Sequence, residues 1–394
     1  METSWEEALQ AAAGGLDRAR HTGVAALAGP RNTNEEFYLL ARIFRSLLQS
    51  PDVAVPGGSP SPTSVLGGAT IAAMEQADRI LLVDADPKAR QHVLDLRVRK
   101  QILRRGIPVA VLANEETALD LRATAVGPFD AVHPATTIRQ LIALQGDPAG
   151  EAPEAVKKVA ATLRGAARGL VVYDERLLMG DEGEETLAAL VALAAKLGTA
   201  EGAPARPLAL AKAANSRGAA EMGAQGGWLA GGVAQGTGDV HARLGKAWGA
   251  QPAAGVGRSQ DDIFTAARQG SIRGLFLLEY DPIAEGVHEA QASLERTPFV
   301  VVQAARTSPV VQYANVVFPN TAYAETAGTL TNTEGRVQRL RSSVIPPDYV
   351  REGWQVLADL GLRLGGSLNY LTVEDVTQEI ARVTGLPSWA GLLE

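Results

Sequence analysis

The chain has 394 residues, of which 46% are hydrophobic and 21% charged, with a formal net charge of −7 and no cysteine. This balance is typical of a well-packed globular protein and argues against a nucleic-acid partner, which would require clustered Lys and Arg. The lack of cysteine excludes disulfides, Cys-ligated zinc and Cys-held iron–sulfur clusters in this chain.

The first part of the chain alternates apolar strands with amphipathic helices. Ser4 and Glu7 form a capping-box sequence ahead of one helix, and Thr33 and Glu36 form a second. Between them the apolar run GVAALAG, residues 23–29, is typical of a buried parallel strand. The Pro-, Gly- and Ser-rich residues 51–68 predict a long loop. After it we expect a helix over 72–76, a strand over 79–87, a helix over 89–106 and a strand over 107–114.

The same alternation continues to the end of the chain. We expect helices over 137–145, 153–166, 184–198, 261–270, 286–296, 350–366 and 372–385, and strands over 169–175, 207–215, 274–282, 298–305 and 314–319. Strands that alternate with helices through short loops predict an α/β fold with one or two doubly wound, mostly parallel sheets. The strand at 207–215 is predicted to begin a second series of alternating strands and helices, and the last two helices are predicted to form a small helical appendage.

Two turns at predicted strand ends resemble each other and carry acidic residues. LLVDADP contains Asp84 and Asp86, and LLEYDP contains Glu279 and Asp281. Ligands of open α/β sheets bind at such strand ends, but the negative charge disfavours a pyrophosphate. The simpler interpretation is that Asp86 and Asp281 cap helices that begin at the following proline.

The polar stretch GTLTNTEGRVQRL, residues 328–340, is the strongest candidate binding segment. Thr329, Thr331, Asn332 and the Arg336 guanidinium could hold an anionic, hydrogen-bonding ligand. Alternatively, these groups satisfy one another at an inter-domain turn, which the spacing alone favours.

Other sites find little support in the sequence. There is no Gly-x-Gly-x-x-Gly, P-loop or Gly-x-Ser-x-Gly motif, and the five histidines have no metal-ligand spacing. No apolar run approaches the roughly 20 residues that cross a bilayer, so we predict no direct membrane insertion. The N-terminus METSWEEALQ also lacks the features of a signal peptide.

The order of these motifs resembles the molybdopterin oxidoreductase family. The resemblance rests on GPRNTNEEFYLLARIFR (29–45), on the strand, turn and Arg-rich helix over 76–106, and most specifically on YANVVFPNTAYAETAGTLTNTEGRVQ (313–338). NSRGAAEMG followed by GWLAGG is similar to one branch, the NuoG-type large subunit of the peripheral arm of bacterial respiratory complex I.

The sequence departs from the family pattern at positions that would face the cofactor. The family's molybdenum ligand falls in the loop PGGSPSPTSVLGG, where Ser59 is the nearest candidate. Asp84 stands where the family has a glycine, Asp86 and Asp281 stand where it has Asn before Pro, and Gly335 replaces an arginine. The family's N-terminal cysteine-rich region and C-terminal β-barrel have no counterpart in this sequence.

The resemblance therefore implies a vestigial cleft rather than a working site. Its expected residues are Ser59, Asp84, Asp86, Asp281, Thr331, Asn332, Glu334 and Arg336. We expect no catalytic residue, bound cofactor or metal in this chain, and we expect Glu325, Gly328, Thr329, Asn332 and Arg336 to hold a structural turn. Arg336→Ala is then expected to cost stability without loss of any chemistry.

The family fold also implies a discontinuous α/β domain over 1–55 and 201–345, an inserted α/β domain over 56–200 and a C-terminal helical segment over 346–394. By resemblance, the chain is expected to be a structural part of NADH:quinone oxidoreductase on the cytoplasmic side of the membrane. Its partners would be other peripheral-arm subunits, which the C-terminal tail PSWAGLLE would contact, with iron–sulfur clusters held elsewhere. The alternatives are a small molybdenum- or tungsten-dependent oxidoreductase of the formate dehydrogenase type, using Ser59 and Arg336, and a free-standing nucleotide-binding module.

Overall fold

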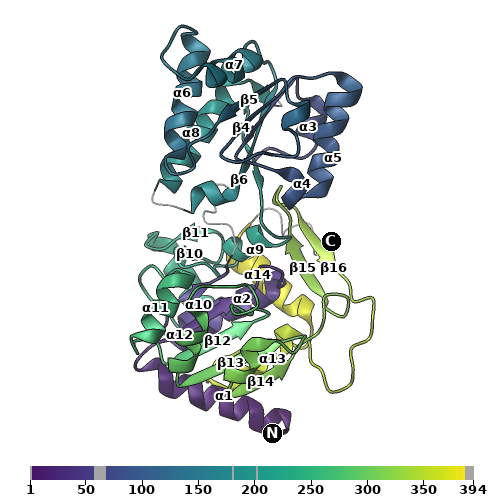
Figure 1. The fold of residues 1–394 in the computed structure, drawn as a ribbon. Helices are drawn as coiled ribbons and strands as arrows, with labels where there is room; N and C mark the ends of the chain where they lie inside the picture. Colours follow the sequence, from purple (N-terminus) through teal and green to yellow (C-terminus); the bar gives the residue numbers. More distant parts are fainter. Residues whose placement is uncertain (1, 57–67, 180–181, 201–202, 387–394) are drawn as a thin grey trace. The chain divides into compact units, whose positions relative to one another are not determined.

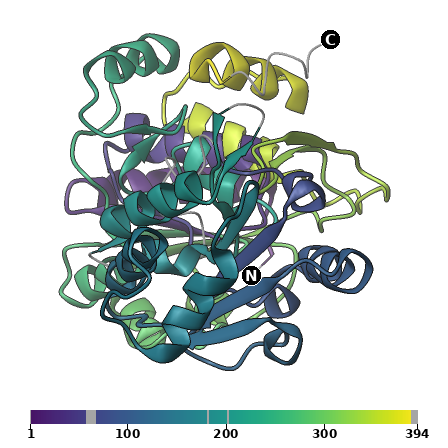
Figure 2. The ribbon, with the colours of Figure 1, turned by 90° about the horizontal axis from the view of Figure 1, so that it is seen from above.

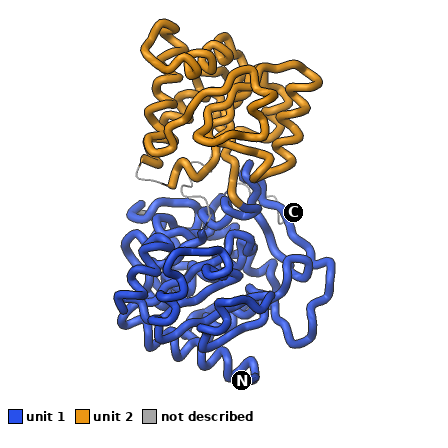
Figure 3. The backbone as a smooth tube through the Cα atoms, in the orientation of Figure 1, with its two compact units in different colours: residues 1–58, 213–394 blue, residues 59–212 orange. Residues whose placement is uncertain are grey.

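The computed structural model describes residues 2–56, 68–179, 182–200 and 203–386, and the chain divides into two compact units (Figure 3). Unit 1 comprises Met1–Gly58 and Ala213–Glu394, and unit 2 comprises Ser59–Lys212. The divisions thus fall at 58/59 and 212/213, compared with 55/56 and 200/201 expected from the sequence.

Unit 1 is built around a parallel sheet whose strands come from both ends of the chain (Figure 1). Its elements are α1 Trp5–Arg20, β1 Val24–Ala28, α2 Asn34–Arg42, the π-helix η1 Ile43–Leu47, β2 Val53–Ala54, α9 Ser216–Glu221, β10 Trp228–Leu229, β11 Val233–Ala234, α10 Gly238–Trp248, α11 Gln260–Arg268, β12 Gly274–Leu278, α12 Ala290–Arg296, β13 Phe299–Ala304, the 3₁₀ turn η6 Pro309–Tyr313, β14 Val316–Pro319, β15 Gly328–Thr331, β16 Val337–Leu340, α13 Gly353–Arg363 and α14 Val373–Thr384.

The strand order in this sheet is β14-β13-β12-β1-β2, with every pairing parallel. β1 and β12 are buried along their whole length, as expected for central parallel strands. Helices α1, α2 and α13 pack on one face and α11 and α12 on the other. The strands β15 and β16 form a separate antiparallel hairpin.

Unit 2 contains a second parallel sheet. Its elements are α3 Ala73–Gln76, β3 Arg79–Val83, α4 Pro87–Arg90, α5 His92–Lys100, the π-helix η3 Gln101–Arg105, β4 Val109–Ala113, η4 Asp120–Arg122, β5 Ala125–Pro128, α6 Pro134–Gly146, α7 Glu154–Leu163, β6 Gly169–Asp174, η5 Glu175–Leu178, α8 Gly183–Lys196, β7 Thr199–Ala200, β8 Ala203–Pro204 and β9 Leu208–Leu210. Helices α3 and α5 cover one face of the sheet and α6, α7 and α8 the other (Figures 1 and 2).

The strand order β5-β4-β3-β6-β9 shows why the boundary near residue 200 was misplaced. β9, within the predicted restart, pairs in parallel with β6, with Leu208 opposite Val172. It is therefore the last strand of unit 2 rather than the first strand of the returning domain. The predicted α/β class with two mostly parallel sheets is confirmed.

Both predicted N-terminal capping boxes are present, at Ser4–Glu7 and Thr33–Glu36. Within the described ranges, no helix combines the length and apolarity that a bilayer crossing requires.

The two C-terminal helices are part of unit 1, not an appendage. Trp354 and Leu357 of α13 and Ile380 of α14 are buried in the same core as α1 and α2. The predicted tail PSWAGLLE, residues 387–394, lies outside the described residues.

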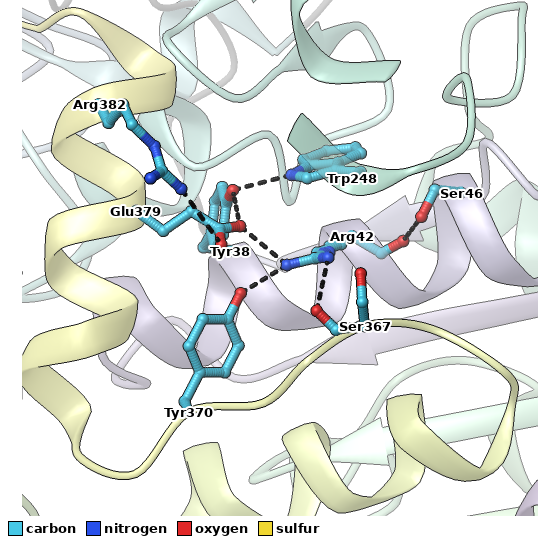
Figure 4. Close-up of polar contacts among 8 residues, drawn as sticks. All are labelled: Tyr38, Arg42, Ser46, Trp248, Ser367, Tyr370, Glu379 and Arg382. Atoms are coloured by element: carbon cyan, nitrogen blue, oxygen red, sulfur yellow. Dashed lines mark hydrogen bonds and ion pairs between the residues drawn. The ribbon is translucent and has the colours of Figure 1, made fainter. Parts of the chain in front are cut away.

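A buried polar network fixes α14 to α2 (Figure 4). Arg42 of α2 donates a hydrogen bond to Glu379 of α14 at 2.8 Å and another to the Tyr370 hydroxyl. Tyr38 also donates to Glu379, at 2.7 Å, while accepting a hydrogen bond from Trp248 at 2.8 Å. The Arg42 side chain is only 1% exposed, so this ion pair is shielded from solvent and holds the helices in register.

Candidate functional site

Each sheet has a topological switch point, where chain connections leave a pair of neighbouring strands in opposite directions. In unit 1 this point lies between β12 and β1, and in unit 2 between β3 and β6. Of the predicted site residues that the structure describes, Asp84, Asp86 and Asp281 lie in loops that follow strands at these two points, and the remaining four lie in the β15–β16 hairpin: Thr331, Asn332, Glu334 and Arg336.

At the unit 1 switch point, the start of α2 binds the β15–β16 hairpin through Glu35. Its carboxylate accepts hydrogen bonds from the backbone N–H and the hydroxyl of Thr329, both at 2.8 Å, and from Thr377 of α14 at 2.8 Å. Glu35 is fully buried, and this burial raises the pKa of its carboxyl despite those hydrogen bonds. Gly328, with φ +146°, lets the hairpin approach so closely that a Cβ there would lie 2.7 Å from Glu35 Oε2.

Two asparagines complete this junction. Asn34 donates to the hydroxyls of Thr329 and Thr331 at 3.1 Å each, and Asn215 accepts the Thr331 backbone N–H at 2.8 Å. Asn215 also donates to the carbonyl of Asn32 at 2.8 Å. The polar groups of Thr329 and Thr331 thus bond to Glu35, Asn34 and Asn215 inside unit 1, and not to one another at an inter-domain turn as the spacing had suggested.

Asn332 organises the turn between β15 and β16. Its side-chain Oδ1 accepts hydrogen bonds from the backbone N–H groups of Glu334 at 3.0 Å and Arg336 at 2.9 Å. Its backbone N–H donates to the Arg336 carbonyl at 3.0 Å. The Arg336 side chain is exposed and, among the described residues, makes no hydrogen bond or ion pair. The expectation that Arg336 holds this turn is therefore correct for its backbone and wrong for its guanidinium.

Gly335 is a structural requirement of this hairpin as well as a departure from the family pattern. Its φ is +84°, and a Cβ at this position would lie 2.1 Å from Nη2 of Arg217. The Arg217 guanidinium packs against this glycine, forms an ion pair with Glu221 at 3.0 Å and donates to the Thr333 carbonyl at 3.3 Å. Arg217 and Glu221 are 10% and 1% exposed.

Sequence reasoning missed Arg217 and Glu221. They lie in the glycine-rich segment 216–232, whose lack of periodicity gave no sign of α9. The available signal was their i,i+4 spacing, which places an Arg and a Glu on one side of a helical turn.

The acidic turn after β12 also serves the fold. Glu279, with φ +46°, accepts hydrogen bonds from the Ala305 backbone N–H at 2.6 Å and from Asn320 at 2.9 Å. Asp281 accepts the backbone N–H groups of Ile283 and Ala284, both at 2.9 Å. No helix begins at Pro282: Asp281 caps a turn, and α12 starts only at Ala290. Burial alone would raise the pKa of Asp281, but these bonds and others from Ser308 and Val310 lower it.

The switch point of unit 2 holds the matching acidic turn. Asp84, with φ +47°, accepts the Asn114 backbone N–H at 3.1 Å, and burial raises the pKa of its carboxyl. Asp86 caps α4 by accepting the Lys88 backbone N–H at 3.0 Å, as the simpler interpretation predicted. Ser59 lies outside the described residues.

Beside this turn lies a polar pocket of about 450 Å³, lined in part by two ion-paired arginines. Asp174, at the end of β6, is 2% exposed and pairs with Arg90 at 3.4 Å and with Arg176 at 3.0 Å. Because both guanidiniums already face this carboxylate, the pocket offers little positive charge to a bound anion.

Comparison with known proteins places this geometry in a family. The family model described as molybdopterin oxidoreductase matches residues 1–363. Curated relatives include the NADPH-Fe(3+) oxidoreductase subunit alpha of Geobacter sulfurreducens, 27% identical over 100% of this chain and 51% of that protein. A putative formate dehydrogenase, YrhE, of Bacillus subtilis is 26% identical over 98% of this chain and 44% of that protein. The NuoG-type NADH-quinone oxidoreductase subunit of Mycobacterium tuberculosis is 30% identical over 99% and 47%.

The chain therefore spans about half the length of the curated relatives it matches. Among solved structures, a chain of the formyltransferase/hydrolase complex FhcABCD from Methylorubrum extorquens, determined with methylofuran, has the same fold. It superposes with a TM-score of 0.63 at 20% identity, covering 92% of this chain and 96% of that chain. From the match over most of its length, this chain belongs to the molybdopterin oxidoreductase family.

Proposed function

We propose that this chain is a non-catalytic scaffold subunit of a multi-subunit complex, in which the family fold is retained without its cofactor. The observation that carries the proposal is the space beside Gly335, which the Arg217 guanidinium fills while paired to Glu221. The family pattern has an arginine at position 335, which would face the cofactor. In this chain position 335 is glycine, and the guanidinium beside it is that of Arg217, which forms a buried ion pair with Glu221.

Most of the predicted cleft residues that the structure describes offer nothing to a phosphate-bearing pterin, and the exposed guanidinium of Arg336 is the exception. Phosphate binding requires free N–H donors or unpaired cations. The Thr329 and Thr331 N–H groups donate to Glu35 and Asn215, and the unit 2 turn presents carboxylates instead of donors.

The complex that we favour is the peripheral arm of respiratory NADH:quinone oxidoreductase, on the cytoplasmic side of the membrane. The similarity to the NuoG-type subunit of Mycobacterium tuberculosis supports this assignment. In it, electrons would pass through iron–sulfur clusters held by other chains or by a segment beyond the matched region, and this chain would brace its neighbours.

A second candidate is a subunit of a formyltransferase/hydrolase complex. One observation favours it: the match to the Methylorubrum chain covers nearly the full length of both partners, whereas the curated relatives are about twice as long. Because that similarity is only 20% in sequence, it supports the fold directly and this function only by the agreement in length.

Elemental analysis tests the claim that both proposals share, namely that this chain binds no molybdenum or tungsten cofactor. The chain is purified from its native host grown with molybdate and tungstate, and each metal is quantified per chain together with extractable pterin. We expect neither metal nor pterin above background. Stoichiometric molybdenum or tungsten with pterin would refute the scaffold role and favour the alternative of a small oxidoreductase of the formate dehydrogenase type.

The subunits that co-purify then separate the two complexes. Association with cluster-bearing subunits and NADH:quinone oxidoreductase activity would support the respiratory assignment. Association with subunits that carry formyltransferase or hydrolase activity would refute it and support the second candidate.

A further inference from the structure

An exposed apolar stripe runs along α5 and its continuation η3 in unit 2. Val93, Leu96 and Leu103 are 62%, 65% and 67% exposed. Leu94 and Val98 of the same helix are buried in the core beneath the sheet face. The helix therefore has apolar side chains on two opposite sides, of which only one packs against the residues that the structure describes.

The stripe is surrounded by positive charge. Residues 92–105 carry five Lys and Arg side chains and one acidic residue, Asp95, although the whole chain has a net charge of −7. Glu75 of α3 accepts hydrogen bonds from Arg97 at 2.8 Å and Lys100 at 2.9 Å. Five basic side chains against two carboxylates leave this surface positive, and Arg104 is exposed.

We propose that this α5 surface, defined by Val93, Leu96, Leu103 and the basic side chains around them, docks an acidic subunit of the same complex. This inference rests on the proposed scaffold function. Protein interfaces combine an apolar centre with a polar rim, and a partner with acidic residues around an apolar patch would complement both features.

The same observations disfavour the other occupants. Two copies of this chain meeting through the α5 surface would bring two positive rims together, which repel. An anionic membrane would suit the charge, but interfacial helices insert aromatic as well as aliphatic side chains, and this stripe has only Val and Leu.

The test uses the full chain, tagged and expressed in its native host, with a photo-crosslinking residue at position 96 and a control at position 256. Val256 is 73% exposed and lies in unit 1. We expect position 96 to crosslink to a different subunit, through a segment with more Asp and Glu than Lys and Arg. No crosslink, or a crosslink to lipid or to a second copy of this chain, would overturn the proposal.

Charge variants provide the second arm. The pair Leu96→Glu and Leu103→Glu should reduce recovery of the crosslinked subunit roughly tenfold or more, since it removes apolar contact and repels an acidic rim. Leu96→Lys with Leu103→Lys should reduce it less, and Val256→Glu should leave it unchanged. Equal recovery for the Glu and Lys pairs would contradict an acidic partner.

This design separates the two levels of the argument. If wild-type chain assembles with other subunits and the Glu pair does not weaken that assembly, the docking surface is wrong and the scaffold role stands. If wild-type chain purifies without any other subunit, both are refuted.

Discussion

Glu36 allows the electrostatics of the α2 start to be tested directly. Its carboxylate accepts a hydrogen bond from the Thr33 backbone N–H at 2.8 Å, and Glu36 is only 3% exposed. Burial is the main cause that raises the pKa of Glu36 from 4.5 to about 7; the hydrogen bond from Thr33 opposes it, and the nearby charges of Glu279 and Glu35 add to it.

The sign of the pH effect follows from this raised pKa. In the folded state Glu36 holds its proton up to about pH 7, whereas in the unfolded chain it loses it near 4.5. Its contribution to stability is therefore complete below pH 4.5 and is lost as the pH rises through 7. At about 1.4 kcal/mol per pKa unit, the free energy of unfolding should fall by about 3 kcal/mol across this range on account of Glu36.

The perturbation is Glu36→Gln, which keeps an acceptor for Thr33 and removes the titration. The control is Glu7→Gln at the other capping box, where Glu7 is exposed and hydrogen bonds, chiefly from Thr3, lower its pKa. Urea unfolding is followed between about pH 4.5 and 8 by tryptophan fluorescence. All five tryptophans fall in the ranges of unit 1, so this signal reports the unit that contains Glu36.

We expect wild type to lose stability as the pH rises, and Glu36→Gln to show a shallower fall. Part of the slope should remain because burial also raises the pKa of Glu35. Glu7→Gln should retain the wild-type slope. A Glu36→Gln profile parallel to that of wild type across the whole range would refute the assignment of this titration to Glu36.

Three further substitutions test the contacts. Gly335→Ala places a Cβ into the Arg217 guanidinium at a positive φ and should cost about 2 kcal/mol in urea unfolding; an unchanged midpoint would contradict the close packing. Arg336→Ala should stay within about 0.5 kcal/mol of wild type by the same assay, because its side chain is exposed; a loss above about 2 kcal/mol would show that the guanidinium does hold the turn. Arg42→Met should cost about 3 kcal/mol because it removes the buried cation from Glu379 and leaves only Arg382, which is 75% exposed and 3.8 Å away; adding Glu379→Met should recover part of that loss, and purely additive losses would show that the pair does not interact.

Local features of the fold were predictable from sequence because their causes are local. Both N-terminal capping boxes and the apolar runs that became β1, β3 and β12 depend on residues within a few positions of each other. The sheet to which a strand belongs is not local information. β9 looked like the start of a new domain because an apolar strand carries no mark of its partner, which here is β6.

The same limit explains what was missed at the candidate site. A glutamate in the first turn of a helix is usually solvated and favourable beside the helix N-terminus. Glu35 is buried because the hairpin that carries Thr329, 294 residues away, and helix α14 with Thr377 both contact it. The resemblance to the family pointed to the correct hairpin, but it assigned Arg336 a role that the buried Arg217 fills.

The two acidic turns hold equivalent strand ends in the two sheets. In unit 2, Asp84 directly follows β3 and accepts the first N–H after the neighbouring strand β4, that of Asn114. In unit 1, Glu279 directly follows β12 and accepts the first N–H after the neighbouring strand β13, that of Ala305.

Both acidic residues have a left-handed backbone, with φ of +47° and +46°, a conformation that costs a residue other than glycine about 1 kcal/mol. This cost is offset where the side chain satisfies an N–H that would otherwise need another acceptor. In each turn, then, the chain supplies its own anion at a strand end where related folds bind external ones. Under the proposed scaffold role, this internal carboxylate would keep the turn in place of a ligand.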